Sequence, residues 1–467
     1  MSTLTMKFGG SSVGATTALT QVVSIVLQEH ERWDRLIVVV SALEGVTDSL
    51  IEAAHLAQLS NRRGYRRITA TLRQRHLALV EHLPLGTNER STLQADIDRL
   101  LFDMLDICQT LADGPAETIT PDKIDAIIGV GERLSARIVA ALLRQNGIRS
   151  VAMDATELII TDNTFGNAVP DMPITRSRID EHLLPMLSRR IIPVVTGFIA
   201  GTLTGKPTTL GRGGSDYTAS IISVCTNSKE VWIYTDVDGM MSTDPREVEE
   251  AKVIPELSYD EVAELAYFGA RILHARMIRP LQEFSIPLRI KNIFKPQQSG
   301  TLIHAATPRI ARVIKAVTGI QGIALTAPHS GSLSAISELV DETLHKAIGS
   351  HADVMISSQS SSNSFLCFVI PTNAGPDAIH TAQTALEERL RNYHDSTWHV
   401  QPVSLITAIG ASIDSLNGLT AHIFEALDNI RILALSQGPS HCSLSIVVEP
   451  HNADTALRQI HALTVST

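Results

Sequence analysis

Short runs rich in Val and Ile alternate with stretches of helical periodicity through the first two thirds of the chain. The runs are RLIVVVSAL (35–43), IIPVVTGFIA (191–200), EVWIYTDVDG (230–239) and IPLRIKN (286–292), and each ends in turn residues. Strands that alternate with helices are typical of an α/β domain with a mostly parallel sheet. In such a sheet, ligands bind beyond the carboxyl ends of the strands. The turns that follow the strands are therefore where chemistry is expected.

Three turns at predicted strand ends carry residues suited to phosphate. In MKFGGSSVG (6–14), Lys7 precedes the glycines, whereas the lysine of a Walker loop follows them. In GRGGSDYTA (211–219), a double glycine leads into a helix N-terminus, where backbone N–H groups and the helix dipole favour an anion. TDVDGMMSTDPR (235–246) places hydroxyls, carboxylates and an arginine after a strand. Each turn alone is more often ordinary turn chemistry, but together they favour phosphate binding.

Three other segments have simpler interpretations. In GVGERLSARIVAALL (129–143), Leu134 stands where a dinucleotide fingerprint needs its third glycine, so we expect a helix with Glu132 in its first turn. GTLTGKPTTLG (201–211) is too short for a Walker loop and has Pro207 in place of Ser or Thr, so we expect a hairpin. Residues 50–128 look mainly helical, and their arginine-rich part is interpreted as a solvated helix face rather than an anion site.

Composition narrows the class of protein. The formal net charge of -10 argues against nucleic acid or an anionic membrane as the main partner. The cysteines, Cys108, Cys225, Cys367 and Cys442, lie far apart without CxxC spacing, which fits reduced thiols and argues against a zinc site or a disulfide framework. We find no signal peptide and no apolar run of membrane-spanning length. The sequence therefore predicts a cytoplasmic protein with no metal site of its own.

The last third of the chain contains an internal repeat. DVMISSQSSSNSFLCFVIP (353–371) and RILALSQGPSHCSLSIVVEP (431–450) share a Ser-Gln pair and an apolar strand, offset by 436 − 358 = 78 residues. Each copy follows a strand-like run and a helix. Two copies of one small α/β unit therefore follow the large domain, a layout suited to a paired sensing module. Pro, Gly and polar residues in FKPQQSGTLIHAATPR (294–309) indicate the join.

Seven motifs in order resemble the signatures of aspartate kinases. They are KFGGSSV, VVSALEGVTD, GERLSA, TGF, TLGRGGSDYTA, YTDVDG with STDPR, and LAYFGARILH. They cover the whole first domain, and the tail resembles the tandem ACT domains of such enzymes. The resemblance implies an amino-acid kinase fold over 1–304, an α/β fold with a mostly parallel sheet between helices. It implies two ferredoxin-like ACT units over 305–467, at about 314–390 and 400–467, with an interleaved arrangement left open.

The resemblance implies transfer of the γ-phosphoryl group of ATP to the side-chain carboxylate of L-aspartate, with Mg²⁺ arriving on the nucleotide. The product, 4-phospho-L-aspartate, leads toward lysine, threonine and methionine. Lys7 and Asp216 are the implied catalytic residues, with Lys7 beside the phosphates. The implied aspartate-binding residues are Ser41, Thr47, Glu132, Phe198, Arg212 and Ser215. The implied ATP-binding residues are Lys7, Gly9, Gly10, Ser11, Thr235, Asp236, Met241, Arg246, Arg271 and Ile272.

The chain departs from the family pattern near the nucleotide residues. Many relatives have lysine where this chain has Arg271, proline where it has Ala275, and tyrosine where it has Met241. Arg271 keeps the positive charge, so we expect the activity to be retained.

Several alternatives stay open at this point. Glutamate, acetylglutamate and uridylate kinases share the fold, and a catalytically inactive amino-acid sensor could retain it. A fusion to homoserine dehydrogenase needs a dinucleotide domain, which this sequence does not carry, so we expect a kinase without it. Lysine and threonine are both candidate effectors, and because ACT units usually pair, we expect a homodimer or higher homo-oligomer.

Overall fold

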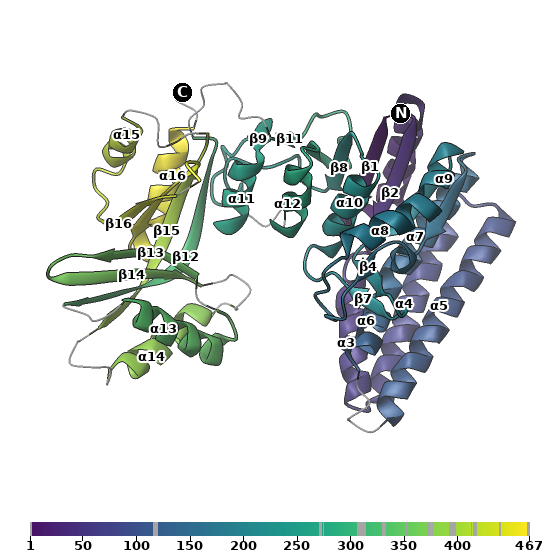
Figure 1. The fold of residues 1–467 in the computed structure, drawn as a ribbon, viewed down its shortest axis with the longest axis horizontal. Coiled ribbons are helices and arrows are strands. Elements are labelled where there is room, and N and C mark those ends of the chain that lie inside the picture. Colours follow the sequence, from purple (N-terminus) through teal and green to yellow (C-terminus); the bar gives the residue numbers. More distant parts are fainter. Residues whose placement is uncertain are drawn as a thin grey trace. The chain divides into compact units, whose positions relative to one another are not determined.

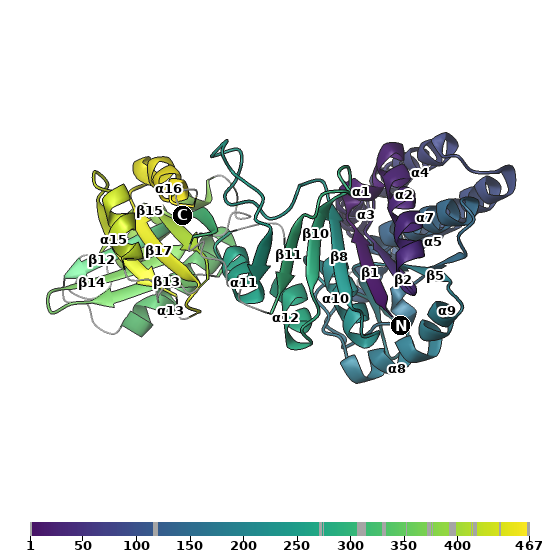
Figure 2. The ribbon, with the colours of Figure 1, turned by 90° about the horizontal axis from the view of Figure 1, so that it is seen from above.

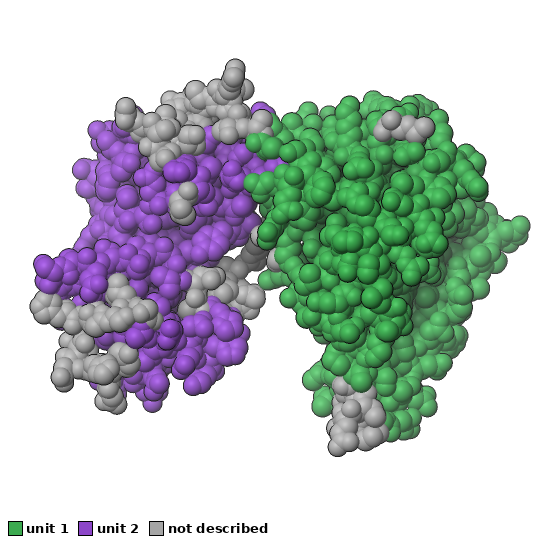
Figure 3. All heavy atoms as spheres, in the orientation of Figure 1, with its two compact units in different colours: residues 1–240, 273–305 green, residues 241–272, 306–467 purple. Residues whose placement is uncertain are grey.

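The computed structural model divides the chain into two compact units. The first comprises residues 1–240 and 273–305, and the second comprises residues 241–272 and 306–467 (Figure 3). The structure describes residues 2–114, 120–269, 273, 275–305, 314–328, 333–351, 353–370, 375, 377–391, 398–411, 413, 418–438 and 440–464. In these residues, no helix is long and apolar enough to cross a membrane.

A large sheet forms the centre of the first unit. Its strands are ordered β3 (Ser150–Met153), β5 (Ile192–Thr196), β2 (Arg35–Val40), β1 (Thr3–Phe8), β8 (Glu230–Thr235), β10 (Leu288–Asn292) and β11 (Thr301–His304). All neighbours pair in parallel except β10 and β11, which are antiparallel. Every residue of β1 and β5 is buried. The predicted mostly parallel sheet is confirmed.

Helices cover both faces of this sheet (Figures 1 and 2). On one face, α2 and α7 contact the strands, and α3, α4 and α5 pack outside them. On the other face, α10 contacts β1, β2 and β8, and α8, α9 and α12 lie beside it. The helices are α1 (Gly10–Val13), α2 (Thr16–Arg32), α3 (Val46–Gln58), α4 (Arg62–His82), α5 (Thr87–Asp113), α6 (Pro121–Ile128), α7 (Val130–Gln145), α8 (Met172–His182), α9 (Leu184–Ser188), α10 (Gly214–Cys225) and α12 (Ala275–Glu283).

A small second sheet contains the hairpin that the sequence predicts. The hairpin is β6 (Ile199–Thr202) and β7 (Pro207–Thr209), which pair antiparallel, with β4 (Ile160–Thr161) beside β6. The stretch after residue 258 contains two helices, α11 and α12. The first, α11 (Tyr259–Tyr267), ends before Gly269, whose φ of 101° is left-handed and incompatible with a continuing helix.

The second unit contains one antiparallel sheet built from the repeat. Its strand order is β13 (Asp353–Gln359), β14 (Asn363–Val369), β12 (Ala316–Pro328), β15 (His399–Ile409), β17 (Ser443–Val448) and β16 (Ile432–Gln437). The helices are α13 (Leu333–Ile348), α14 (Ala378–Leu390), α15 (Leu419–Ala426) and α16 (Ala453–Ala462). Each copy reads strand, helix, two strands, helix, which is the order of the first five elements of a ferredoxin-like unit. Both outer hairpins have a register shift at the same place, between Val354 and Ile356 and between Ile432 and Ala434, again 432 − 354 = 78 residues apart.

The segment 241–272 packs within the second unit, although the resemblance assigns it to the kinase domain. Its elements are β9 (Glu256–Ser258) and α11. Val317 donates its N–H to the carbonyl of Ser242 at 2.8 Å, and Lys315 Nζ lies 2.8 Å from the buried Glu261 carboxylate. The segment is therefore joined to the six-stranded sheet of the second unit by backbone and charged contacts.

Candidate active site

Lys7 pairs with Asp216 at the carboxyl end of the central strand. Lys7 Nζ lies 2.6 Å from Asp216 Oδ1, and the two side chains are only 10% and 16% exposed. Lys7 comes from β1, and Asp216 lies in the first turn of α10. A charge-assisted contact of this kind fixes a flexible lysine in one position. The structure thus holds a partly buried ammonium group at the strand end where the sequence predicts phosphate.

The turn after Lys7 requires glycine at its second position. A Cβ on Gly10 would lie 3.0 Å from the carbonyl oxygen of Ala42 and 3.3 Å from the Glu44 nitrogen. The backbones of the turns after β1 and β2 therefore lie against each other. Gly10 also begins the short helix α1, and Gly9 and Ser11 flank it in the same turn.

Backbone hydrogen bonds join the turns that follow four adjacent strands. Gly9 donates to the Tyr234 carbonyl at 3.3 Å, and Ser41 donates to the Phe8 carbonyl at 3.1 Å. Gly197 donates to the Val40 carbonyl at 2.8 Å. These contacts bring together the ends of β1, β2, β5 and β8. Of the predicted aspartate residues, Ser41 lies in one of these turns and Thr47 in the first turn of α3.

Glu132 presents an unpaired carboxylate oxygen beside the β2 turn. Its Oε1 accepts a hydrogen bond from the Ala42 N–H at 3.3 Å, and Oε2 has no hydrogen-bond partner in the described part of the chain. Glu132 is 2% exposed, and this burial raises the pKa of its carboxyl to about 8. A buried carboxylate with one free oxygen is suited to an incoming ammonium group, which would favour the ionised form.

Phe198 adopts a strained backbone conformation next to the α10 N-terminus. Its φ of 64° lies in the left-handed region, where a bulky residue is an outlier. Its N–H donates to Thr218 Oγ1 at 3.0 Å, and its carbonyl accepts from the Leu210 N–H at 2.8 Å. These bonds hold Phe198 between the β5 turn, the loop that carries Arg212, and the first turn of α10, which carries Ser215.

The predicted nucleotide residues are divided between the two units. Thr235 Oγ1 donates to Asp236 Oδ1 at 3.0 Å at the end of β8, in the first unit. Met241 and Arg246 belong to the second unit, where Arg246 is paired with Asp244 at 2.6 Å and is 83% exposed. Arg271 and Ile272 lie outside the described residues. The geometry therefore supports the Lys7 side of the predicted site more fully than the Arg246 side.

Comparison with models of known protein families identifies the family of this chain. The model of the amino acid kinase family matches residues 2–292, more than half of this chain. The chain belongs to the amino acid kinase family. An ACT domain model matches residues 406–463, within the second unit. The fold and the family resemblance that the motifs predict are confirmed.

Curated relatives and solved structures similar to this chain include aspartokinases. The bifunctional aspartokinase/homoserine dehydrogenase 1, chloroplastic, of Arabidopsis thaliana is 32% identical over 98% of this chain and 50% of its own length. Escherichia coli aspartokinase III in complex with aspartate and ADP has a TM-score of 0.75 at 26% identity, with 98% of this chain and 99% of that chain covered. The same enzyme in complex with lysine and aspartate has a TM-score of 0.79 at 26% identity, with 98% of each chain covered. The chain spans about half the length of the bifunctional relatives it matches.

The sequence patterns did not single out Asp238, a carboxylate with two polar partners beside β8. Asn292 Nδ2 donates to Asp238 Oδ1 at 2.6 Å, and Lys295 Nζ lies 2.7 Å from Asp238 Oδ2. The hydrogen bond from Lys295 lowers the pKa of the Asp238 carboxyl. Asn292 ends the predicted strand 286–292, so the same strand-end reasoning that selected Thr235 could have selected it.

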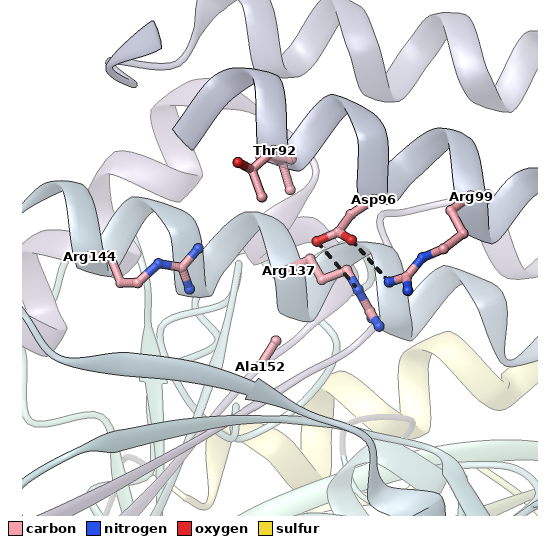
Figure 4. Close-up of a pocket in the computed structure, with 7 residues that line it drawn as sticks. Thr92, Asp96, Arg99, Arg137, Arg144 and Ala152 are labelled. Atoms are coloured by element: carbon pink, nitrogen blue, oxygen red, sulfur yellow. Dashed lines mark hydrogen bonds and ion pairs between the residues drawn. The ribbon is translucent and has the colours of Figure 1, made fainter. Parts of the chain in front are cut away.

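A cavity of about 200 Å³ between α5, α7 and β3 is lined by several arginines (Figure 4). Asp96 lies 3.0 Å from Arg99 and 4.0 Å from Arg137, and Arg144 is paired with Glu89 at 2.7 Å. β3 is the edge strand, with β5 and β2 between it and β1. The carboxylates offset most of the positive charge, so we interpret this cluster as ion pairing that joins the two helices.

Proposed function

We propose that the chain is an aspartate kinase, which transfers the γ-phosphoryl group of ATP to the side-chain carboxylate of L-aspartate to form 4-phospho-L-aspartate and ADP. The observation that carries the proposal is the Lys7–Asp216 pair, held where the ends of four strands meet beside the free oxygen of Glu132. The motif order and the aspartokinase relatives support the choice of acceptor.

In this reaction a carboxylate oxygen of aspartate attacks the γ-phosphorus, and the bond to the β,γ-bridging oxygen breaks. Aspartate needs no general base, because a carboxyl group with an ordinary pKa near 3.9 is already ionised at pH 7. Stabilising charge on the migrating group is then the main task. Lys7 supplies a positive charge beside the phosphates, and Asp216 fixes its position. Mg²⁺ would be held largely by the phosphates and water.

The substrate's other groups have matching partners in the first unit. Glu132 would accept the ammonium group of aspartate. Arg212 would bind a carboxylate with its forked guanidinium. Ser41, Thr47, Phe198 and Ser215 would complete the aspartate pocket. Gly9, Gly10, Ser11, Thr235 and Asp236 would contact ATP, with Met241, Arg246, Arg271 and Ile272 contributing as the family pattern implies.

We propose that the second unit senses an amino acid, lysine or threonine, and thereby regulates the kinase. The ACT match, the repeat and the lysine complex of a structural neighbour support this role. In HSGSLSAISELV (329–340), small and hydroxyl residues stand at a strand-to-helix turn suited to the effector, and residues 329–332 of this segment lie outside the described residues. A homodimer or higher homo-oligomer, a cytoplasmic location, and domain limits at 304/305 remain proposals from the resemblance.

An ATP-dependent hydroxamate assay tests the activity, because it traps acyl phosphates formed on any carboxylate acceptor. We expect product with L-aspartate and little with L-glutamate or N-acetyl-L-glutamate, and loss of product in Lys7→Ala. Turnover with one of the other acceptors would identify another amino acid kinase. Absence of turnover with every acceptor, including uridylate in a coupled ADP assay, would favour an inactive sensor.

A further inference from the structure

Arg212 is exposed to solvent in the loop between β7 and α10. Its side chain makes no hydrogen bond or ion pair with the residues that the structure describes. Its neighbours Gly211 and Gly213 both have left-handed backbones, with φ of 75° and 71°. Glycine in such positions loses much conformational freedom on ordering. A substrate-binding arginine on this loop therefore needs support from elsewhere in the unit.

The buried carboxylate of Asp125 accepts hydrogen bonds from Thr209, just before the loop that carries Arg212. Asp125, on α6, is 3% exposed. Its Oδ2 accepts hydrogen bonds from the Thr209 N–H at 2.8 Å and the Gly166 N–H at 2.9 Å, and its Oδ1 accepts from Thr209 Oγ1 at 3.1 Å. Burial raises the pKa of this carboxyl, and the three hydrogen bonds act in the opposite direction. The carboxylate therefore joins β7 to the 162–169 segment.

The Arg276 guanidinium donates a hydrogen bond to Leu210, the residue that follows Thr209 in the same loop. Its Nη1 donates to the Leu210 carbonyl at 3.0 Å and also to Asn167 Oδ1, and its Nη2 donates to the Ala168 carbonyl at 3.5 Å. Its guanidinium lies 5.4 Å from the centre of the Tyr217 ring, next to Asp216. One side chain from α12 thus contacts the segments on both sides of Arg212.

Two further observations show how closely the loop and α12 are packed against their neighbours. A Cβ on Gly211 would lie only 2.5 Å from Asn167 Oδ1, the atom that Arg276 holds in place. The α12 helix is itself fixed to α10, because Ser220 Oγ donates to the Met277 carbonyl at 2.8 Å in a buried position. The Arg276 contacts with Leu210 and Ala168 are partly buried, and α12, which carries Arg276, packs against α10.

We propose that Asp125 and Arg276 are positioning residues for the reaction, which hold the 209–211 backbone so that Arg212 projects toward the substrate carboxylate. The proposal rests on the proposed function and on the role of Arg212 in it. Neither residue touches substrate; both act through the loop. A guanidinium can make the Leu210, Asn167 and Ala168 contacts at once because its donors form a planar fork, whereas a lysine ammonium is a single point.

Steady-state kinetics on the full chain tests the proposal. We expect Arg276→Ala to raise KM for aspartate about 10-fold to 100-fold, because a misplaced substrate contact has effects of that order, with KM for ATP changed less than about twofold. Arg276→Lys should lie between. Asp125→Asn should shift KM for aspartate in the same direction. Arg279→Ala is the matched control, because Arg279 is on the same helix, 83% exposed and paired only with Glu283.

A double variant separates positioning from a general loss of structure. If Arg276 acts through Arg212, the KM of Arg212→Ala/Arg276→Ala for aspartate should be no higher than that of Arg212→Ala alone. Limited trypsin digestion gives a readout besides activity, since we expect faster cleavage after Arg212 in Arg276→Ala with an unchanged melting temperature. Additive effects in the double variant, or equal rises in both KM values, would overturn the proposal.

The wild-type and Arg212→Ala measurements distinguish a failure of the proposed function from a failure of the role of Arg212 or of the positioning role. Absence of aspartate-dependent turnover in the wild type would reject the proposed function. A normal KM in Arg212→Ala would reject the role of Arg212. A raised KM in Arg212→Ala with a normal KM and a normal trypsin rate in Arg276→Ala and Asp125→Asn would reject the positioning role alone.

Discussion

The two sheets of this chain bury their strands in different ways. In the first unit, helices cover both faces, every residue of β1 and β5 is buried, and the turns at the strand ends carry the polar groups. In the second unit, the outer strands β13 and β16 contact each other, so the sheet curls and covers part of its own face. No residue of β16 is fully buried, and Leu435 and Val354 on the outer strands are 37% and 39% exposed.

This difference separates where each unit can recognise a small molecule. A parallel sheet leaves its backbone turns together at one edge, so the first unit offers fixed N–H groups and side chains at strand ends. A curled antiparallel sheet offers side chains along its outer strands, where Ser357, Ser358 and Gln359 are exposed. Variants in the first unit should therefore change turnover, and variants in the second unit should change stability or regulation.

The largest expected effect is on Lys7. We expect Lys7→Ala to lower kcat by about 10²-fold to 10³-fold, as when one charge-stabilising donor is lost. Because Asp216 is only 16% exposed, the variant should also lose some thermal stability. Steady-state rates and thermal unfolding check both effects, with Ser358→Ala in the second unit as the control. A near-normal kcat in Lys7→Ala would contradict the catalytic role of the pair.

The raised pKa of Glu132 predicts that the stability of the chain and its kcat/KM for aspartate depend on pH. Its folded pKa of about 8 lies above the ordinary value near 4.5, so the carboxyl contributes stability that is lost as pH rises toward 8. Glu132→Gln should therefore gain stability over the wild type between pH 5 and pH 8, on the order of 3 kcal/mol. The variant should also bind aspartate more weakly. Wild-type kcat/KM for aspartate should rise with pH below about 8 and be flat in Glu132→Gln. Parallel denaturation curves at the two pH values would contradict the assigned cause.

Two arginines test which side of the predicted site the structure supports. We expect Arg212→Ala to raise KM for aspartate by the equivalent of about 1.5–3 kcal/mol, the usual contribution of a charge-assisted hydrogen bond. Arg246→Ala should change KM for ATP only severalfold, because Arg246 is 83% exposed and paired with Asp244. Isothermal titration with ADP and then with aspartate separates the two ligands. A larger effect of Arg246→Ala than of Arg212→Ala would reverse this assignment.

The parts that the sequence could predict are those with local patterns. The parallel sheet follows from Val- and Ile-rich runs, and the Lys7, Gly10 and Glu132 turns follow from their place after strands or at a helix start.

Contacts between isolated residues far apart could not be predicted. Asp125 and Thr209 are 84 residues apart, and neither stands in a recognisable motif with the other. Arg276 and Leu210 are 66 apart, and the contact uses a carbonyl that any residue could provide. The attachment of 241–272 to the second unit likewise rests on Ser242 and Lys315, whose partners lie in another part of the chain.

The smallest expected effect is at Ser242, in the second unit. Its Oγ lies 2.8 Å from His461 Nε2 and accepts a hydrogen bond from the Lys252 N–H at 2.9 Å, in a buried position. Ser242→Ala leaves both groups without this partner, so we expect a loss of about 1–2 kcal/mol in the stability of the second unit. Turnover at 25 °C and saturating ATP should be unchanged, because the predicted catalytic and aspartate-binding residues lie in the first unit, whereas the second unit holds only predicted ATP-binding residues such as Met241 and Arg246.

Acid should weaken the same region even in the wild type. Burial lowers the pKa of His461 below its ordinary 6.5, so the unfolded chain binds more protons than the folded unit as pH falls below that value. The stability that the neutral imidazole contributes is therefore present above pH 6.5 and is lost as pH decreases toward the folded pKa. Hydrogen exchange of the Ser242 and Val317 amides at pH 5.5 and pH 7.5 measures this directly. We expect less protection at pH 5.5 in the wild type. A His461→Gln variant should lose this pH dependence, because glutamine carries no titrating proton. Unchanged protection of these amides between the two pH values, relative to their intrinsic exchange rates, would show that His461 does not hold the 241–272 segment on the sheet of the second unit.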